Sequence, residues 1–345
     1  MISGKALLLF MGGFLGGVFL PSCGNQFGVS SGSGNSGPDE TAGSAPLNLF
    51  ERSPGVDNGN VSQTASLSIN SLNRRSVTLY DMHSKKRSLE GARLRVFNNE
   101  SERRAPIYND FVNRNPDFDS DEFKTFMAYA HLSRSIRDAD RIFTGAHARQ
   151  NFSKVYPLEA FSREPGHPLS TGYIINFQTS GSQINVNRAR ISFFQDRSNA
   201  QYGFYNTVDE SDAIYHEFGH VVQRVFNERV EILAESQDLG MILEALSDYY
   251  AAASLTDAQI LRYLEANSPN VFSSNGRTGN RHTRNAENRL FFPDSYLNHE
   301  HLDGRVLAAT LNDFRKYLQG QVVSLTNCSS GSCQVHSPGA VSYTH

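Results

Sequence analysis

Residues 209–225 have the sequence DESDAIYHEFGHVVQRV, and the pattern His-Glu-x-x-His at its centre decides how the chain is expected to fold. Acidic and hydroxyl side chains at the start of this stretch are typical of a helix N-terminus. Apolar residues recur at helical spacing along one face: Ile214, Phe218, Val221 and Val225. On the roughly opposite face, His216 and His220 stand one turn apart, where both imidazoles can reach one metal ion. Glu217 beside them can take a proton from water that the metal activates. The alternative is a pair of surface histidines without a ligand.

Residues 240–253, with the sequence GMILEALSDYYAAA, form a second predicted helix. Glu244 and Asp248 are its only charged residues, and they stand four apart on one face. Burial of uncompensated carboxylates is costly, so a nearby cation is expected. Glu244 is then a third metal ligand, and Asp248 accepts a hydrogen bond from a ligating imidazole. The alternative is an acidic stripe that faces solvent. Two imidazoles and one carboxylate leave a fourth position open, which is typical of catalytic zinc.

At these residues the chain resembles the gluzincin metallopeptidases, especially the thermolysin-like and fungalysin-like branches, whose pattern is HExxH followed by ExxxD. The resemblance implies a gluzincin-type catalytic domain with one zinc ion held by His216, His220 and Glu244. It also implies that Glu217 is the general base and that Asp248 is the hydrogen-bond partner of His216.

A third segment, residues 298–308 with the sequence NHEHLDGRVLA, extends the resemblance. In the family, a histidine that precedes a helix donates a hydrogen bond to the oxyanion of the tetrahedral intermediate. The matching residue is His301, and His299 is the second candidate. Only residues 319–345 follow the helix that is expected to start in this segment, whereas relatives usually continue into further helices. Either this branch is abbreviated or the chain is truncated at its C-terminus.

Strand patterns precede helical patterns along the chain, so the expected class is α+β, with a strand-rich N-terminal part and a mainly helical C-terminal part. The expected strands are residues 76–80, 92–97, 172–177, 184–187 and 190–194. A helix is expected from Asp121 to about Phe143, with its cap at Asp119-Ser120. Asp117, Asp119 and Asp121 resemble a calcium loop only superficially, because the required glycine and bidentate glutamate are missing; calcium is therefore not expected.

The N-terminus predicts export. Lys5 precedes the apolar run ALLLFMGGFLGGVFL, which is typical of a secretory signal. The following Leu-Pro-Ser-Cys resembles the lipobox of bacterial lipoproteins, which implies cleavage before Cys23 and lipidation of that residue. An uncleaved membrane anchor or an ordinary secretory signal is the alternative. Residues 24 and 25 lack the aspartate of inner-membrane retention, so by family analogy a lipid-anchored location at the outer membrane is favoured, on either its periplasmic or its outer face.

The expected organisation has four parts. Residues 1–22 form a lipoprotein signal peptide, and residues 23–65 form a Gly/Ser-rich flexible tether. Residues 66–112 form a strand-rich region, and residues 113–345 form the catalytic domain.

Composition excludes several classes of protein. The formal net charge is −3, from 32 Lys and Arg against 35 Asp and Glu, so no broad basic surface is expected to bind nucleic acid. The mean hydropathy is −0.44, and the one long apolar run is the leader, so a polytopic membrane protein is excluded. Cys328 and Cys333 are expected to form a disulfide in an oxidising compartment, with two free surface thiols as the alternative.

These features together predict an exported zinc endopeptidase that hydrolyses protein or peptide substrates and contacts a membrane only through its lipid anchor. An edge strand near residues 184–194 is expected to align an extended peptide. The alternative is a surface lipoprotein that keeps the peptidase fold and its zinc but acts as a binding or adhesion module.

Overall fold

The structure is a computed structural model, and it describes residues 47–49, 75–77, 79–81, 88–103, 105, 120–165, 172–180, 183–196, 205–226, 237–255, 257, 259–260, 284–288, 290, 300–318, 325–329 and 332–336. The expected signal peptide and Cys23 lie outside these residues. No helix among the described residues is long and apolar enough to cross a membrane.

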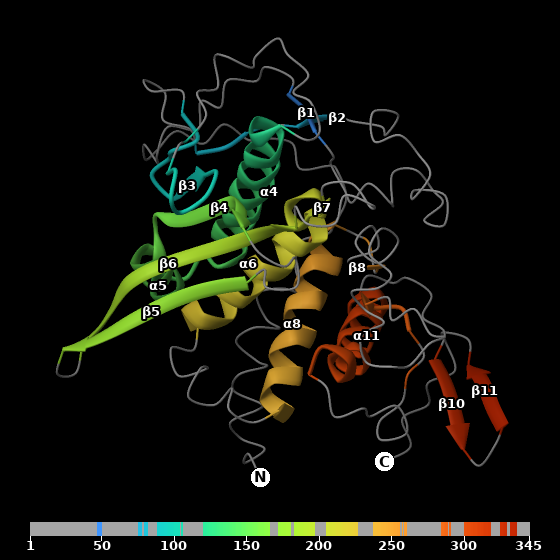
Figure 1. Cartoon of the computed structure of the whole chain (residues 1–345). Helices are drawn as coiled ribbons and strands as arrows, with labels where there is room; N and C mark the ends of the chain where they lie inside the picture. Colours follow the sequence, from blue (N-terminus) through green and yellow to red (C-terminus); the bar gives the residue numbers. More distant parts are fainter. Residues whose placement is uncertain are drawn as a thin grey trace, which may run out of the picture.

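A mixed five-stranded sheet forms one layer of the molecule (Figure 1). Its strands are β3 (Leu94–Phe97), β4 (Leu158–Pro165), β5 (Gly172–Ser180), β6 (Gln183–Asp196) and β7 (Tyr205–Asn206). They lie in the order β3-β4-β6-β5, and β7 pairs with the end of β6. β3, β4 and β6 run parallel to one another, whereas β5 is antiparallel to β6.

The edge of this sheet differs from the expected one. Arg190 of β6 lies opposite Glu159 of β4 on one side and Ile174 of β5 on the other, so this part of β6 is inside the sheet. The expectation of an edge strand near residues 184–194 is therefore wrong over the stretch that pairs with both neighbours. Among the described strands, β3 and β5 are the outer strands of this sheet, and residues 183–189 of β6 pair with β5 alone.

The sheet packs against the long helix α4 (Asp121–Ile142), which also contacts helix α6 (Ser211–Phe226). Ser120 caps α4, because its hydroxyl accepts a hydrogen bond from the backbone N–H of Phe123 at 3.1 Å. Contacts with both the sheet and α6 bury most of α4, including Phe123, Phe126 and Met127. The predicted helix and its serine cap are thus confirmed.

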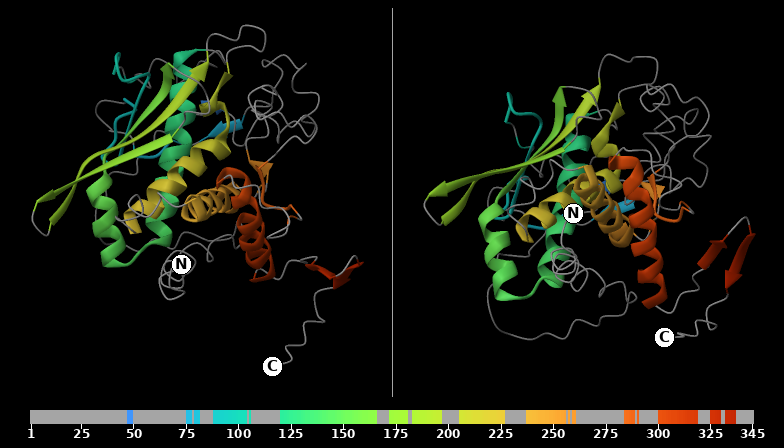
Figure 2. Two further views of the ribbon diagram at one scale, coloured as in Figure 1. Left: turned by 60° about the horizontal axis from the view of Figure 1, so that its bottom comes forward. Right: turned by 90° about the horizontal axis from the view of Figure 1, so that it is seen from below.

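The C-terminal half is mainly helical. α6 packs against α8 (Gln237–Leu255), and α8 packs against α11 (Glu300–Leu318) (Figure 2). The remaining elements are α5 (Ala146–Val155), the short helix η4 (Thr207–Asp209) and three two-stranded sheets. These sheets are β1 (Leu47–Leu49) with β2 (Arg75–Val77), β8 (Gln259–Ile260) with β9 (Arg284–Asn285), and β10 (Leu325–Ser329) with β11 (Ser332–His336).

The expected mixture of helices and strands is confirmed, but its N-terminal parts are joined to the rest of the fold. Leu47–Leu49 form a strand inside the range expected to be a tether, and Leu49 is fully buried in the main core. β3, from the expected strand-rich region, pairs with β4 of the expected catalytic domain. One sheet therefore spans the expected boundary at residue 112. β2 is shorter than the strand expected over residues 76–80, and the two strands expected over 184–194 form the single strand β6.

Candidate metal centre

The histidine pair lies on α6, and a buried ion pair fixes the approach to this helix. The ammonium of Lys124 on α4 donates to both carboxylate oxygens of Asp209, at 2.6 and 2.8 Å, and neither side chain is exposed to solvent. The predicted site residues lie in the next turns of α6 and are buried, with exposed fractions of 5% for His216, 8% for Glu217 and 6% for His220. The surface histidine pair considered from the sequence is therefore not what the fold contains.

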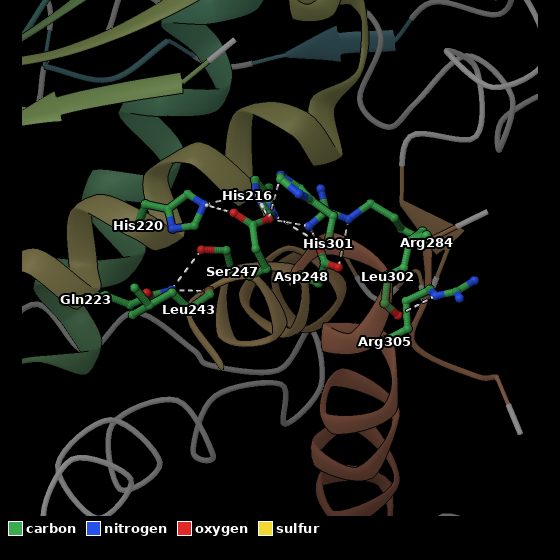
Figure 3. Close-up of polar contacts among 11 residues, drawn as sticks. His216, His220, Gln223, Leu243, Ser247, Asp248, Arg284, His301, Leu302 and Arg305 are labelled. Atoms are coloured by element: carbon green, nitrogen blue, oxygen red, sulfur yellow. Dashed lines mark hydrogen bonds and ion pairs between the residues drawn. The ribbon is translucent and has the colours of Figure 1, made fainter. Parts of the chain in front are cut away.

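A second set of contacts holds α6 beside α8. The amide of Gln223 on α6 donates to the backbone carbonyl of Leu243 at 2.9 Å and to the hydroxyl of Ser247 at 2.8 Å (Figure 3). Both acceptors lie within one helical turn of Glu244, so these bonds bring that part of α8 to the histidine pair.

Three potential ligand atoms converge between the two helices. Nε2 of His216 lies 3.1 Å from Nε2 of His220. One oxygen of Glu244 lies 3.3 Å from the His216 nitrogen, and the other oxygen lies 3.3 Å from the His220 nitrogen. No other group of this kind occurs among the residues that the structure describes. Zinc–ligand distances of about 2.0–2.1 Å in a tetrahedron place ligand atoms about 3.3 Å apart. The two nitrogens, and each nitrogen with its nearer Glu244 oxygen, have about this separation, so the three side chains fit a zinc ion.

Asp248 orients one of the two imidazoles. Its Oδ1 lies 2.8 Å from Nδ1 of His216, and a carboxylate can only accept, so Nδ1 donates the proton. In the neutral form of the ring, which metal binding requires, the lone pair of Nε2 then points towards Glu244 and His220. This is the arrangement that metal-ligating histidines share.

Arg284 of β9 is a member of the site that the sequence patterns did not identify. Its guanidinium donates to Glu244 Oε2 at 2.6 Å and to Asp248 Oδ2 at 3.0 Å, and its side chain is 9% exposed (Figure 3 shows its contact with Asp248). It therefore bridges the ligand carboxylate and the carboxylate that orients His216. The acidic stripe facing solvent, the alternative considered for α8, does not occur.

The buried charges of the site do not cancel among themselves. Arg284 bonds to Glu244 and Asp248, and the carboxylate of Glu217 lies nearby, so in the metal-binding form, in which both imidazoles must be neutral, the formal charge of these residues is two negative. A divalent cation would neutralise it, which is a second respect in which these residues fit zinc.

The pKa shifts follow from this charge pattern. Burial raises the pKa of Glu217, against the opposing effect of the two imidazoles. Burial also acts to raise the pKa of Glu244, but His220 and Arg284 hold it well below its ordinary value. Burial and Arg284 act to lower the pKa of His216, yet the bonds to Asp248 and Glu244 prevail and raise it to about 9. The carboxylates of Asp248 and Glu244 thus stabilise a positive charge placed next to them.

The third segment of the resemblance also reaches the site. His301 lies in the first turn of α11, and its Nε2 is 3.6 Å from Glu244 Oε2. Its side chain is 44% exposed, unlike the buried ligand residues, so it lies on the open side of the site. The second candidate, His299, lies outside the described residues.

The predicted disulfide is far from this centre in the chain. Cys328 and Cys333 are directly opposite partners in the antiparallel hairpin of β10 and β11. Backbone partners of this kind have the separation that a disulfide requires, and the disulfide stays a prediction.

No protein-family model matches the chain, and no curated protein matches it.

Proposed function

We propose that this protein is a zinc endopeptidase of the gluzincin type. The observation that carries the proposal is the convergence of His216, His220 and Glu244 from two helices. The two nitrogens lie 3.1 Å apart, and each lies 3.3 Å from one of the two Glu244 oxygens. When bound there, zinc supplies a Lewis acid that polarises a peptide carbonyl and acidifies water.

The protein's own groups have distinct roles in the proposed hydrolysis. Glu217 takes the proton of the attacking water molecule and passes it to the leaving amine. Burial raises its pKa, which makes the carboxylate a stronger base towards water. His301 donates a hydrogen bond to the oxygen that becomes negative as the carbonyl is attacked. Its exposed position near Glu244 suits a group that meets substrate rather than metal.

The edge of β5 is the proposed site for an extended substrate. β5 contacts α6, the helix with the histidine pair, and among the described strands only β6 pairs with it along its length. An extended peptide can add to such an edge through backbone hydrogen bonds. This favours a protein or peptide substrate.

The proposed location follows from the leader alone: export, cleavage before Cys23 and a lipid anchor in a bacterial cell envelope, with the outer membrane favoured. The protein body would then contact a membrane only through that anchor, and nucleic acid is not a proposed partner.

The test measures zinc and proteolysis in the same preparations. Purified wild-type protein is expected to hold about one zinc ion per chain and to cleave denatured casein. A chelator should stop cleavage, and added zinc should restore it. Glu217→Gln should retain zinc and lose cleavage, whereas Glu159→Gln, a change in a partly exposed ion pair with Arg103, should behave as wild type.

Two results would count against the proposal. Full activity of Glu217→Gln would eliminate the mechanism. Zinc binding without any cleavage by wild-type protein would favour the binding or adhesion module instead.

A further inference from the structure

Two glycines lie where helices of the site approach each other closely. A Cβ atom added to Gly219 of α6 would lie 3.0 Å from Cα and 3.1 Å from Oγ of Ser247 on α8. A Cβ atom added to Gly304 of α11 would lie 2.9 Å from the carbonyl oxygen of Met241 and 3.2 Å from the backbone N of Ala245, also on α8. In both cases the nearest atom belongs to the backbone, which cannot rotate away as a side chain can.

The two contacts lie on either side of Glu244. At about 100° per residue, Met241 and Ser247 lie about 60° to either side of Glu244 around the axis of α8. α6 therefore meets α8 on one side of the ligand carboxylate, and α11 meets it on the other. Gly304 is also close to the ligand residue itself, because its added Cβ would lie 3.5 Å from Cβ of Glu244.

Each glycine shares a helix face with a residue of the site. Gly219 lies three positions after His216 and one before His220, and Gly304 lies three positions after His301. Residues three apart on a helix are neighbours on one face. Gly219 lets α6 approach α8 and thus sets how far His216 and His220 are from Glu244. Gly304 does the same for α11 and thus sets how far His301 is from Glu244.

We infer that Gly219 and Gly304 are positioning residues with separate effects: Gly219 sets the spacing of the metal ligands, and Gly304 sets the place of His301. The inference rests on the proposed peptidase function.

The expected effects follow from contact distances. Carbon atoms pack at about 3.5–4.0 Å, so an alanine at either position moves its helix by about half an ångström. Metal–ligand distances tolerate only about 0.2 Å, so Gly219→Ala should weaken zinc binding by about tenfold or more. Gly304→Ala leaves the three ligands in place but displaces His301, so it should lower kcat by about tenfold without a change in zinc affinity.

The experiment compares Gly219→Ala, Gly304→Ala and the control Gly145→Ala, where an added Cβ meets no atom within 4 Å. Zinc affinity is measured by competition with a chromophoric chelator, and kcat is measured on denatured casein per zinc-loaded molecule. In a His301→Ala background, Gly304→Ala should cause no further loss of kcat. The control should match wild type in both measurements.

Several outcomes would overturn the inference. Wild-type zinc affinity in folded Gly219→Ala, or weaker zinc binding in Gly304→Ala, would do so. If Gly219→Ala does not fold, Gln223→Ala tests the same helix spacing without added bulk, and unchanged zinc affinity there would be equally contrary. If Gly304→Ala does not fold, the contact of Gly304 with α8 is needed for the stability of the whole fold, and the separate role of Gly304 in placing His301 is wrong.

The two proposals fail in different ways. If wild-type protein binds zinc but cleaves nothing, the peptidase proposal fails, while the role of Gly219 is still decided by zinc affinity.

Discussion

At the scale of single residues, the main feature of the candidate metal centre is that several charged side chains are buried together. Glu244 and Asp248 lie side by side on α8, and, in the part of the chain that the structure describes, Arg284 is the guanidinium that contacts both. Removal of one partner of a buried ion pair leaves the other charge uncompensated, which costs about 3–5 kcal/mol. The metal-free protein should therefore depend on Arg284 more than the zinc-loaded protein does, since zinc brings its own positive charge.

Arg284→Gln tests this dependence. We expect the free energy of unfolding of the metal-free protein to fall by about 3–5 kcal/mol. Saturating zinc should raise the melting temperature of this variant more than it raises that of wild type, and calorimetry with and without zinc measures both. Equal zinc-dependent shifts in the two proteins would mean that Arg284 does not compensate these carboxylates.

The same residues show what sequence could and could not predict about the site. The histidine pair, Glu244 and Asp248 were predictable because helix periodicity places residues four apart on one face. Arg284 was not, because it lies in a two-residue strand 36 positions beyond Asp248, and only the tertiary fold brings it back. A signal was nevertheless present: the predicted site had three carboxylates, and one divalent ion leaves a negative charge that requires a further cation.

At the scale of elements, the buried pair of Lys124 and Asp209 connects α4 to the residue that ends η4, just before α6. From the sequence, Asp209 was expected to serve at the N-terminus of the metal-binding helix. In the structure it pairs with a lysine 85 residues earlier, and α6 begins two residues later, at Ser211. Local patterns located the helix correctly but gave no information on this distant partner.

Lys124→Met should leave the carboxylate of Asp209 buried without its cation. We expect the free energy of unfolding to fall by about 3–5 kcal/mol, measured by urea denaturation. The double variant Lys124→Met/Asp209→Leu should recover most of the loss, because apolar residues of similar volume often replace a buried ion pair at little cost. A double variant as unstable as the single one would show that packing, rather than charge, is what Lys124 contributes.

At the scale of the whole molecule, residues far upstream of the metal centre belong to its core. Five leucine and valine side chains from the N-terminal part are fully or almost fully buried in the main hydrophobic cluster: Leu49, Leu79, Leu89, Leu94 and Val96. The sequence predicted a separate strand-rich region here, because local alternation identifies a strand but not its partner. The pairing of β3 with β4 joins residues more than sixty positions apart, and no local pattern encodes such a pairing.

This arrangement predicts which N-terminal truncations the protein tolerates. Each of the five buried side chains contributes about 1.5–3 kcal/mol, and together they match the total stability of a typical domain, about 5–15 kcal/mol. A variant that begins at Ser120 should therefore lose cooperative thermal unfolding and zinc binding. A variant that lacks only the Gly/Ser-rich residues 24–45 should keep the wild-type melting temperature and zinc affinity. If the shorter chain from Ser120 unfolded cooperatively and bound zinc as tightly as wild type, the burial of these five side chains in the main core would contribute no stability.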